Sequence, residues 1–193
     1  HDALPIYGDI NATRLEAGLY GTIERGTWNA KVYNYNSERG IPGAIVNNVW
    51  RRGERVWDTN SFFQGSFVKE VNDQFKTQVN AKYAFYRTHY VNNDDKLIEV
   101  DNLYKQREVY VSTANMYTIF PFWDVSMSYD FQWNEMKADM YGFVFPTRFT
   151  NLLSIATALR LGKVKLQGSG LATFVNDRVK EGPAPKARQI LTP

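Results

Sequence analysis

Apolar and polar residues alternate with a period of two along most of this chain. In residues 123–134 every odd-numbered residue is apolar and every even-numbered residue is polar. A strand points successive side chains to opposite faces, whereas a helix brings a face round only every three or four residues. Residues 123–134 therefore predict a strand with one apolar and one polar face, and the pattern excludes a helix there.

The same pattern predicts seven further strands. Three of them have a clear, uncharged and largely apolar face, and they are residues 15–23, 75–86 and 164–174. Weaker alternation marks three more, which are residues 28–34, 62–69 and 108–119. In the last two of these segments the sequence leaves open which face is apolar.

Residues 151–161 admit two interpretations. Leu153, Ile155 and Leu159 share one face of a strand, but Leu152, Ile155, Ala156 and Leu159 also sit at helical spacing. The strand fits the alternation of the neighbouring segments, and it completes a set of eight.

The connections between these strands alternate between short and long. The short ones are residues 24–26, 71–74, 120–122 and 162–163, and the long ones are residues 37–60, 91–102, 135–148 and 176 onward. Outer-membrane barrels have short turns at one rim and long loops at the other. The spacing thus predicts four antiparallel hairpins with a turn side and a loop side.

Strand length and aromatic placement agree with a membrane wall. The ten steps from Trp123 to Trp133 span roughly 33 Å, which a tilt near 45° projects to about 23 Å. Bacterial barrels carry an apolar band about 25 Å tall, flanked by aromatic residues. Trp28, Phe75 and Trp123 each follow a short turn, and Trp133 ends its strand. We expect these four aromatics to lie at the lipid interface.

Composition removes several other classes of protein. Aromatic residues make up 15% of the chain, yet no apolar run approaches the roughly 18 residues of a membrane-spanning helix. The net charge is +3, but Lys and Arg are scattered, so we expect no nucleic-acid partner. The chain has no Cys, which excludes disulfides and thiolate metal sites.

The first residues need a separate explanation. Residues 1–20 lack the basic start and apolar core of an export signal. Residues 1–6 (HDALPI) resemble the translation of a sequencing adapter, and we interpret them as an artefact. Residues 7–193 then form part of an outer-membrane β-barrel domain that is truncated at this end.

Few residues suggest chemistry. Arg51, Arg52 and Arg55 lie in the longest predicted loop and are candidates for contact with an anionic solute or lipopolysaccharide, because guanidinium pairs with carboxylate and phosphate. His89 lies near Asp94 and Asp95 and would serve as a base or a metal ligand in a barrel hydrolase. We find no phosphate-binding loop and expect no catalytic residue, cofactor or bound metal.

Several stretches resemble the barrel of TonB-dependent outer-membrane receptors. They are Glu38-Arg39-Gly40-Ile41-Pro42-Gly43, Pro121-Phe122-Trp123-Asp124-Val125-Ser126, Phe131-Gln132-Trp133-Asn134, Phe145-Pro146-Thr147-Arg148 and Ala172-Thr173-Phe174-Val175. The resemblance implies a barrel of about 22 strands closed by a plug, which takes up a large scarce solute such as a chelated metal or a cobalamin. The plug and the segment that contacts TonB are missing from this chain, and no ligand residue carries over.

We therefore expect an all-β, antiparallel, transmembrane β-barrel wall of eight strands, as an incomplete open strip in the bacterial outer membrane. Three alternatives remain. A complete small eight-stranded barrel with a structural or adhesive role requires the first and last strands to pair. A barrel hydrolase requires His89. A soluble binding protein requires the apolar faces of residues 75–85 and 123–133 to meet in one interior.

Overall fold

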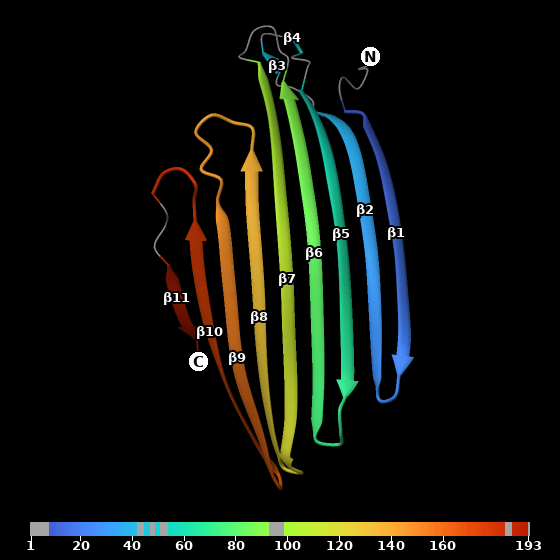
Figure 1. The fold of residues 1–193 in the computed structure, drawn as a ribbon, viewed down its shortest axis with the longest axis vertical. Helices are drawn as coiled ribbons and strands as arrows, with labels where there is room; N and C mark the ends of the chain where they lie inside the picture. The colour runs from blue at the N-terminus through green and yellow to red at the C-terminus, as the bar shows by residue number, and fades with distance from the viewer. Residues whose placement is uncertain are drawn as a thin grey trace.

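The structure is a computed structural model, and it describes residues 8–41, 45–46, 49–50, 54–92, 99–183 and 187–192. Nine strands form one antiparallel sheet in the order β1-β2-β5-β6-β7-β8-β9-β10-β11 (Figure 1). Their bounds are β1 Ile10–Ile23, β2 Gly26–Ile41, β5 Glu54–Glu70, β6 Phe75–Asn92, β7 Val100–Phe120, β8 Trp123–Ala138, β9 Thr147–Leu161, β10 Val164–Arg178 and β11 Arg188–Thr192. A separate two-stranded sheet pairs β3 (Ile45–Val46) with β4 (Val49–Trp50). None of the described residues is helical.

All eight predicted strands are present, and each pairs with its neighbour in sequence through the four short turns. The helical alternative for residues 151–161 is wrong, because β9 runs as a strand through that whole segment. The sequence missed β11, which pairs with the end of β10 in a region expected to be loop.

The long connections are shorter than the sequence indicated. The predicted loop 37–60 is largely strand, because β2 continues to Ile41 and β5 begins at Glu54. Similarly, β6 continues to Asn92 and β7 begins at Val100. These extensions carry polar or charged residues on both faces, such as Glu38 and Arg39, so they lack the alternation by which a strand is recognised.

Local chemistry fixes the short turns. Arg25 and Gly162 adopt φ values of 56° and 60°, which reverse the chain between β1 and β2 and between β9 and β10. Asn72 accepts hydrogen bonds through its side-chain oxygen from the backbone N–H groups of Gln74 and Phe75, at 2.9 and 2.8 Å. This arrangement starts β6 directly at Phe75.

The strand register places every apolar face on the same side of the sheet. Tyr129 of β8 lies opposite Thr113 of β7 on one side and Leu153 of β9 on the other. The same row continues through Val79 to Phe67 and beyond. Residues directly opposite each other share a face, so the faces left open in β5 and β7 are now fixed. Phe63, Phe67, Val109 and Val111 lie on the apolar face, and Phe62 and Tyr110 lie on the polar face, as their partners in the register require.

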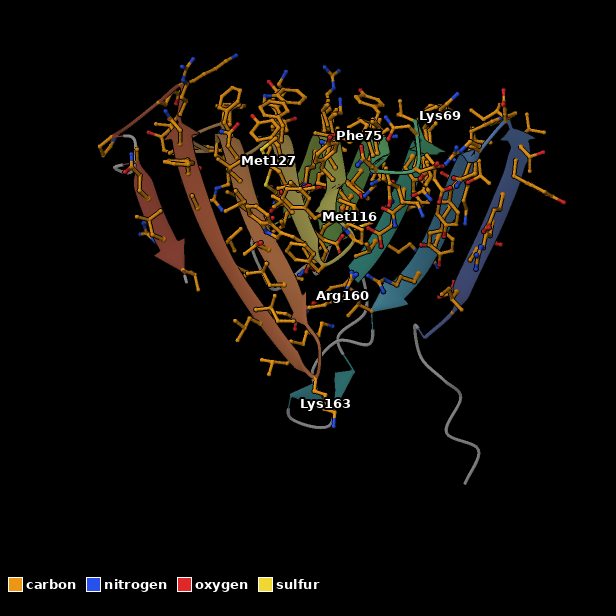
Figure 2. The ribbon with its side chains drawn as sticks, turned by 90° about the horizontal axis from the view of Figure 1, so that it is seen from below. Lys69, Phe75, Met116, Met127, Arg160 and Lys163 are labelled. Carbon is orange, nitrogen blue, oxygen red and sulfur yellow. The ribbon has the colours of Figure 1, made fainter. Side chains whose placement is uncertain are left out.

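The described residues form no hydrophobic core. Among the described residues the only buried apolar side chains are Val56, Ala84 and Ala138, and none of the larger ones is fully buried. Leu19 is 70% exposed and Ile155 is 56% exposed, although both belong to the apolar face. The sheet forms one curved layer without a second layer packed on it (Figure 2). The apolar side chains of residues 75–85 and 123–133 lie on the same face of this layer. They therefore do not face each other across an interior, as the soluble alternative requires.

The strands are staggered in one direction. Ile23 is the last residue of β1, and the row of paired residues that starts from it crosses the sheet to Gly170 of β10. Gly170 lies 170 − 164 = 6 residues beyond Val164, the first residue of β10. The turns accordingly descend step by step from β1/β2 to β9/β10 (Figure 1). With about 3.3 Å per residue and about 4.8 Å between strands, six residues over seven strand spacings correspond to a tilt of about 30°.

The two edges of the sheet do not meet. β1 and β11 stand at opposite ends of the strand order, and neither β10 nor β11 pairs with β1. The sheet is thus an open strip, and the pairing that a complete small barrel requires is not present in the described residues.

Candidate functional site

The apolar face contains a continuous uncharged band, which we call the apolar band. One strand contributes each of eight ranges, and in each range every second residue, counted from the first, belongs to the band. The ranges are 15–23, 28–34, 61–67, 75–85, 109–117, 123–133, 149–161 and 164–174. None of these residues is charged. The first charged residues on this face lie beyond the ends of the band, at Lys69 on the turn side and at Arg107 and Glu135 on the loop side.

The four predicted interface aromatics all lie on this face. Trp28, Phe75 and Trp123 stand close to the turns, and Trp133 lies near the loop side. The Trp28 ring lies over Gly21, where an added Cβ would come within 2.5 Å of the indole nitrogen. The indole N–H of Trp123 donates to the Thr157 hydroxyl at 2.8 Å, so this donor is satisfied within the sheet. Their contact with lipid remains a prediction.

The opposite face, which we call the polar face, is joined by hydrogen bonds between neighbouring strands. Three bonds are representative: Asn80 donates to Ser112 at 3.0 Å, the hydroxyls of Ser128 and Ser154 are 2.6 Å apart, and Thr118 donates to Asp124 at 2.8 Å. Small hydroxyl and amide groups dominate this turn-side half of the polar face. The face is therefore suited to water and not to lipid.

Larger side chains gather in the loop-side half of the polar face. Tyr33 stacks on Phe62 with ring centres 4.8 Å apart, and the Lys82 ammonium lies 5.7 Å from the centre of the Phe62 ring. Lys82 also donates to Glu108 at 3.0 Å. Ala84 lies between Phe62 and Glu108 in the register and is completely buried by them and their neighbours. A small residue is needed at this position.

Of the three candidate arginines, only Arg55 belongs to the described residues. It lies in β5, where its guanidinium bonds to Glu38 and, at 2.9 Å, to Asp9. The prediction that it lies in a loop is therefore wrong, and two carboxylates already contact it. Arg51 and Arg52 lie outside the described residues, as do Asp94 and Asp95.

His89 is held by neighbouring strands. Its Nε2 lies 2.6 Å from the Asp101 carboxylate, and its ring stacks on Trp57 with centres 5.2 Å apart. In the described part of the chain, no serine or threonine hydroxyl contacts the ring, and no group of three metal-ligating residues occurs. Among the described residues, the structure therefore places neither a hydroxyl nucleophile nor a set of three metal ligands beside His89.

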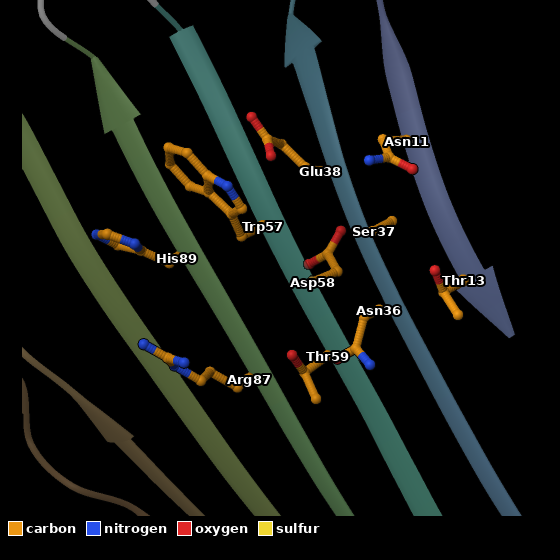
Figure 3. Close-up of a pocket in the computed structure, with 10 residues that line it drawn as sticks. All are labelled: Asn11, Thr13, Asn36, Ser37, Glu38, Trp57, Asp58, Thr59, Arg87 and His89. Carbon is orange, nitrogen blue, oxygen red and sulfur yellow. The ribbon is translucent and has the colours of Figure 1, made fainter. Parts of the chain in front are cut away.

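His89, Trp57 and Arg87 border a hollow of about 440 Å³ on the same face as the apolar band, beyond its loop-side end (Figure 3). Asn11, Thr13, Asn36 and Thr59 also line it. The sequence did not predict this hollow, because its residues come from four strands and its outermost parts were expected to be loop.

Arg148 and Asp177 form a two-pronged ion pair between β9 and β10. The Nε and Nη2 groups of Arg148 donate to the two carboxylate oxygens at 2.6 and 2.8 Å. This bonding lowers the pKa of the Asp177 carboxyl below its ordinary value. The pair ties together the loop-side ends of the two strands.

The described residues contain no helix long and apolar enough to cross a membrane. The sequence matches no protein-family model, and no curated protein is significantly similar to it. Function is therefore inferred from the two faces of the sheet and from the residues that border them.

Proposed function

We propose that this chain is part of the wall of a bacterial outer-membrane β-barrel. The observation that carries the proposal is the apolar band, in which eight strands combine to expose uncharged side chains without a core beneath them. In water, contiguous apolar patches of more than a few hundred Å² mark surfaces that another phase or partner covers. The stagger of the strands and the hydrogen-bonded polar face support lipid on one side and a hydrated lumen on the other.

We further propose that the complete barrel belongs to a TonB-dependent receptor for a large scarce solute, such as a chelated metal or a cobalamin. This part rests on the resemblance of the strand and loop segments described above. Its partners would be a plug domain, TonB and outer-membrane lipid. The small side chains of the turn-side polar face, such as Ser112, Ser128 and Ser154, are compatible with a lumen that holds a further domain.

Site-directed labelling tests the wall. The chain has no Cys, so single cysteines at Ile155 and Ala156, neighbours on opposite faces of β9, give matched reporters. In vesicles that contain the polypeptide, we expect a fluorophore at 155 to be quenched by brominated lipid and one at 156 by aqueous iodide. Equal quenching of both positions by iodide would contradict the proposal.

Uptake measurements test the receptor. Bacteria that carry the full reading frame should accumulate a labelled ferric chelate or cobalamin, and deletion of either this gene or TonB should abolish that uptake. A reading frame with a signal peptide directly before residue 7 and no plug would instead indicate a small barrel.

A further inference from the structure

A row of cationic side chains crosses three strands just beyond the loop-side end of the apolar band. Arg87 of β6 lies directly opposite Lys105 of β7, and Lys105 lies directly opposite Lys137 of β8. All three are on the face of the apolar band. Arg107 lies on this face too, between the row and the band.

Most of these charges lack a counterion. Within residues 8–41, 54–92, 99–183 and 187–192, no carboxylate pairs with Arg87, Lys105 or Arg107, and all three side chains are exposed. Lys137 pairs with Glu135 at 3.3 Å, and Glu135 also lies directly opposite Arg107 in the register. Four cations thus face one carboxylate. Like charges directly opposite each other destabilise a sheet, and a bound anion would offset this repulsion.

The hollow beside Arg87 supplies a different kind of contact. Its lining includes the amide of Asn36, the hydroxyl of Thr59 and the indole of Trp57, which stacks on His89 (Figure 3). Amide and hydroxyl groups exchange hydrogen bonds with sugar hydroxyls, and an aromatic face packs on the apolar face of a sugar ring. Cations and a sugar-sized polar hollow therefore meet at Arg87.

Two carboxylates also border the hollow, and both are already engaged. Arg55 bonds to Glu38. Asp58 receives a hydrogen bond from Thr88 at 2.7 Å and pairs with Arg39 at 3.2 Å. Their charges are therefore offset locally, and Asp101 contacts His89, whereas Arg87 and Lys105 pair with no carboxylate among the described residues.

The position of the row matches that of lipid headgroups. Arg87 is one same-face step beyond Phe85, and Lys137 is two steps beyond Trp133, at about 6.6 Å per step. A bilayer of about 40–45 Å with a hydrocarbon core of about 30 Å leaves a polar layer of roughly 5–8 Å on each side. On these figures Arg87 would lie within that layer, whereas Lys137, about 13 Å along its strand from Trp133, would lie a few Å beyond it.

We propose that the cationic row and the hollow bind the phosphorylated sugar headgroup of an outer-leaflet glycolipid. The phosphates contact Arg87, Lys105, Arg107 and Lys137, since guanidinium and ammonium groups form strong charge-assisted bonds to phosphate. The sugar occupies the hollow. This site rests on the proposed function, because the face that carries it continues into the apolar band.

A charge-matched pair of variants tests the site. The row variant is R87Q/K105Q/K137Q, and the control, K69Q/K163Q/K165Q, removes the same charge near the turns. The probe is a bisphosphorylated glucosamine-disaccharide lipid in neutral detergent. We expect binding to the row variant to be at least tenfold weaker than to the parent, and binding to the control to be unchanged. Equal binding to parent and row variant would overturn the proposal, and so would pyrophosphate binding as tight as that of the lipid.

Thermal unfolding gives a second test, in which the Tm of Lys105→Gln is compared with that of the parent without and with glycolipid. Without glycolipid, Lys105→Gln removes the repulsion from Arg87 and Lys137, so its Tm should equal or exceed that of the parent. With the glycolipid added, the parent should gain more in Tm than the variant. An equal gain in both proteins would contradict a phosphate contact at Lys105.

Lipid quenching at position 155, measured on the same variants in vesicles, separates the two proposals. A row variant that inserts normally and binds glycolipid like the parent overturns the glycolipid site and leaves the wall intact. A protein that binds the lipid headgroup without any quenching by brominated lipid overturns the wall.

Discussion

The two faces of this sheet are made by the same strands but differ in how their side chains interact. On the polar face, side chains contact each other across strands, as in the pairs Asn80–Ser112 and Lys82–Glu108. On the apolar face, residues such as Leu19 and Ile155 remain more than half exposed. Cross-strand hydrogen bonds and ion pairs join much of the polar face, whereas the members of the apolar band share the absence of charge and make few such bonds, as between Trp123 and Thr157. Changes on the two faces should therefore have different consequences.

The largest difference is expected for a charge placed in the middle of the sheet. Ile155→Arg should destabilise the membrane-inserted protein by about 2–4 kcal/mol, because the guanidinium would lie at mid-membrane. Ala156→Arg, one residue away on the polar face, should cost far less. Urea unfolding in vesicles measures both, and equal costs would remove the distinction between the faces.

A larger side chain, unlike a charge, should destabilise the protein more on the polar face than on the apolar face. Ala84 is fully buried between larger neighbours on the polar face, whereas Ala81 is exposed on the apolar face. Ala84→Leu should destabilise the protein by about 1–3 kcal/mol through overpacking. Ala81→Leu, on the same strand, should leave the free energy of unfolding almost unchanged. If Ala84→Leu were also tolerated, the polar face would not be tightly packed at this point.

The smallest expected effect is a pH dependence at the loop-side edge. Arg148 lowers the folded-state pKa of Asp177, so the pair contributes stability above the ordinary carboxyl pKa of about 4 and loses it as the pH falls through the lowered value. Because Arg148 is 58% exposed, the contribution should be below about 1 kcal/mol. The stability difference between parent and Asp177→Asn should be present at pH 7 and vanish near pH 2.

That difference should also depend on the partner. In an Arg148→Gln background, Asp177→Asn should have little effect at either pH. A persistent effect would mean that other groups set the pKa of Asp177.

The sequence predicted the strands best where each face has a single chemistry. In β8 the alternation is complete, and both the strand and its apolar face are confirmed. It could not resolve β5, because Phe62 and Phe63 are adjacent aromatics that lie on opposite faces. Only the register with β6, whose apolar face is known, decides between them.

The cationic row shows why surface sites were harder to predict. Arg87, Lys105 and Lys137 are far apart in sequence, and two of them lie in or next to segments expected to be loop. They come together because strands continue beyond the apolar band. The aromatic positions Trp28, Phe75 and Trp123, by contrast, depend only on the short turns that precede them, which the sequence shows directly.

The stagger of the strands also sets how much of a barrel's circumference each strand would occupy. A strand tilted by about 30° occupies about 5.5 Å of circumference, so the eight long strands cover about 44 Å. Closed on itself, that arc would have a backbone radius of about 7 Å, and the side chains of Tyr33, Phe62 and Lys82 would fill it. Each strand added beyond β1 or β11 would widen the enclosed space by about 1.8 Å, and about 22 strands of this tilt would give a radius of about 19 Å. In the barrel proposed above, the number of strands added at these two edges would set the width of the enclosed space.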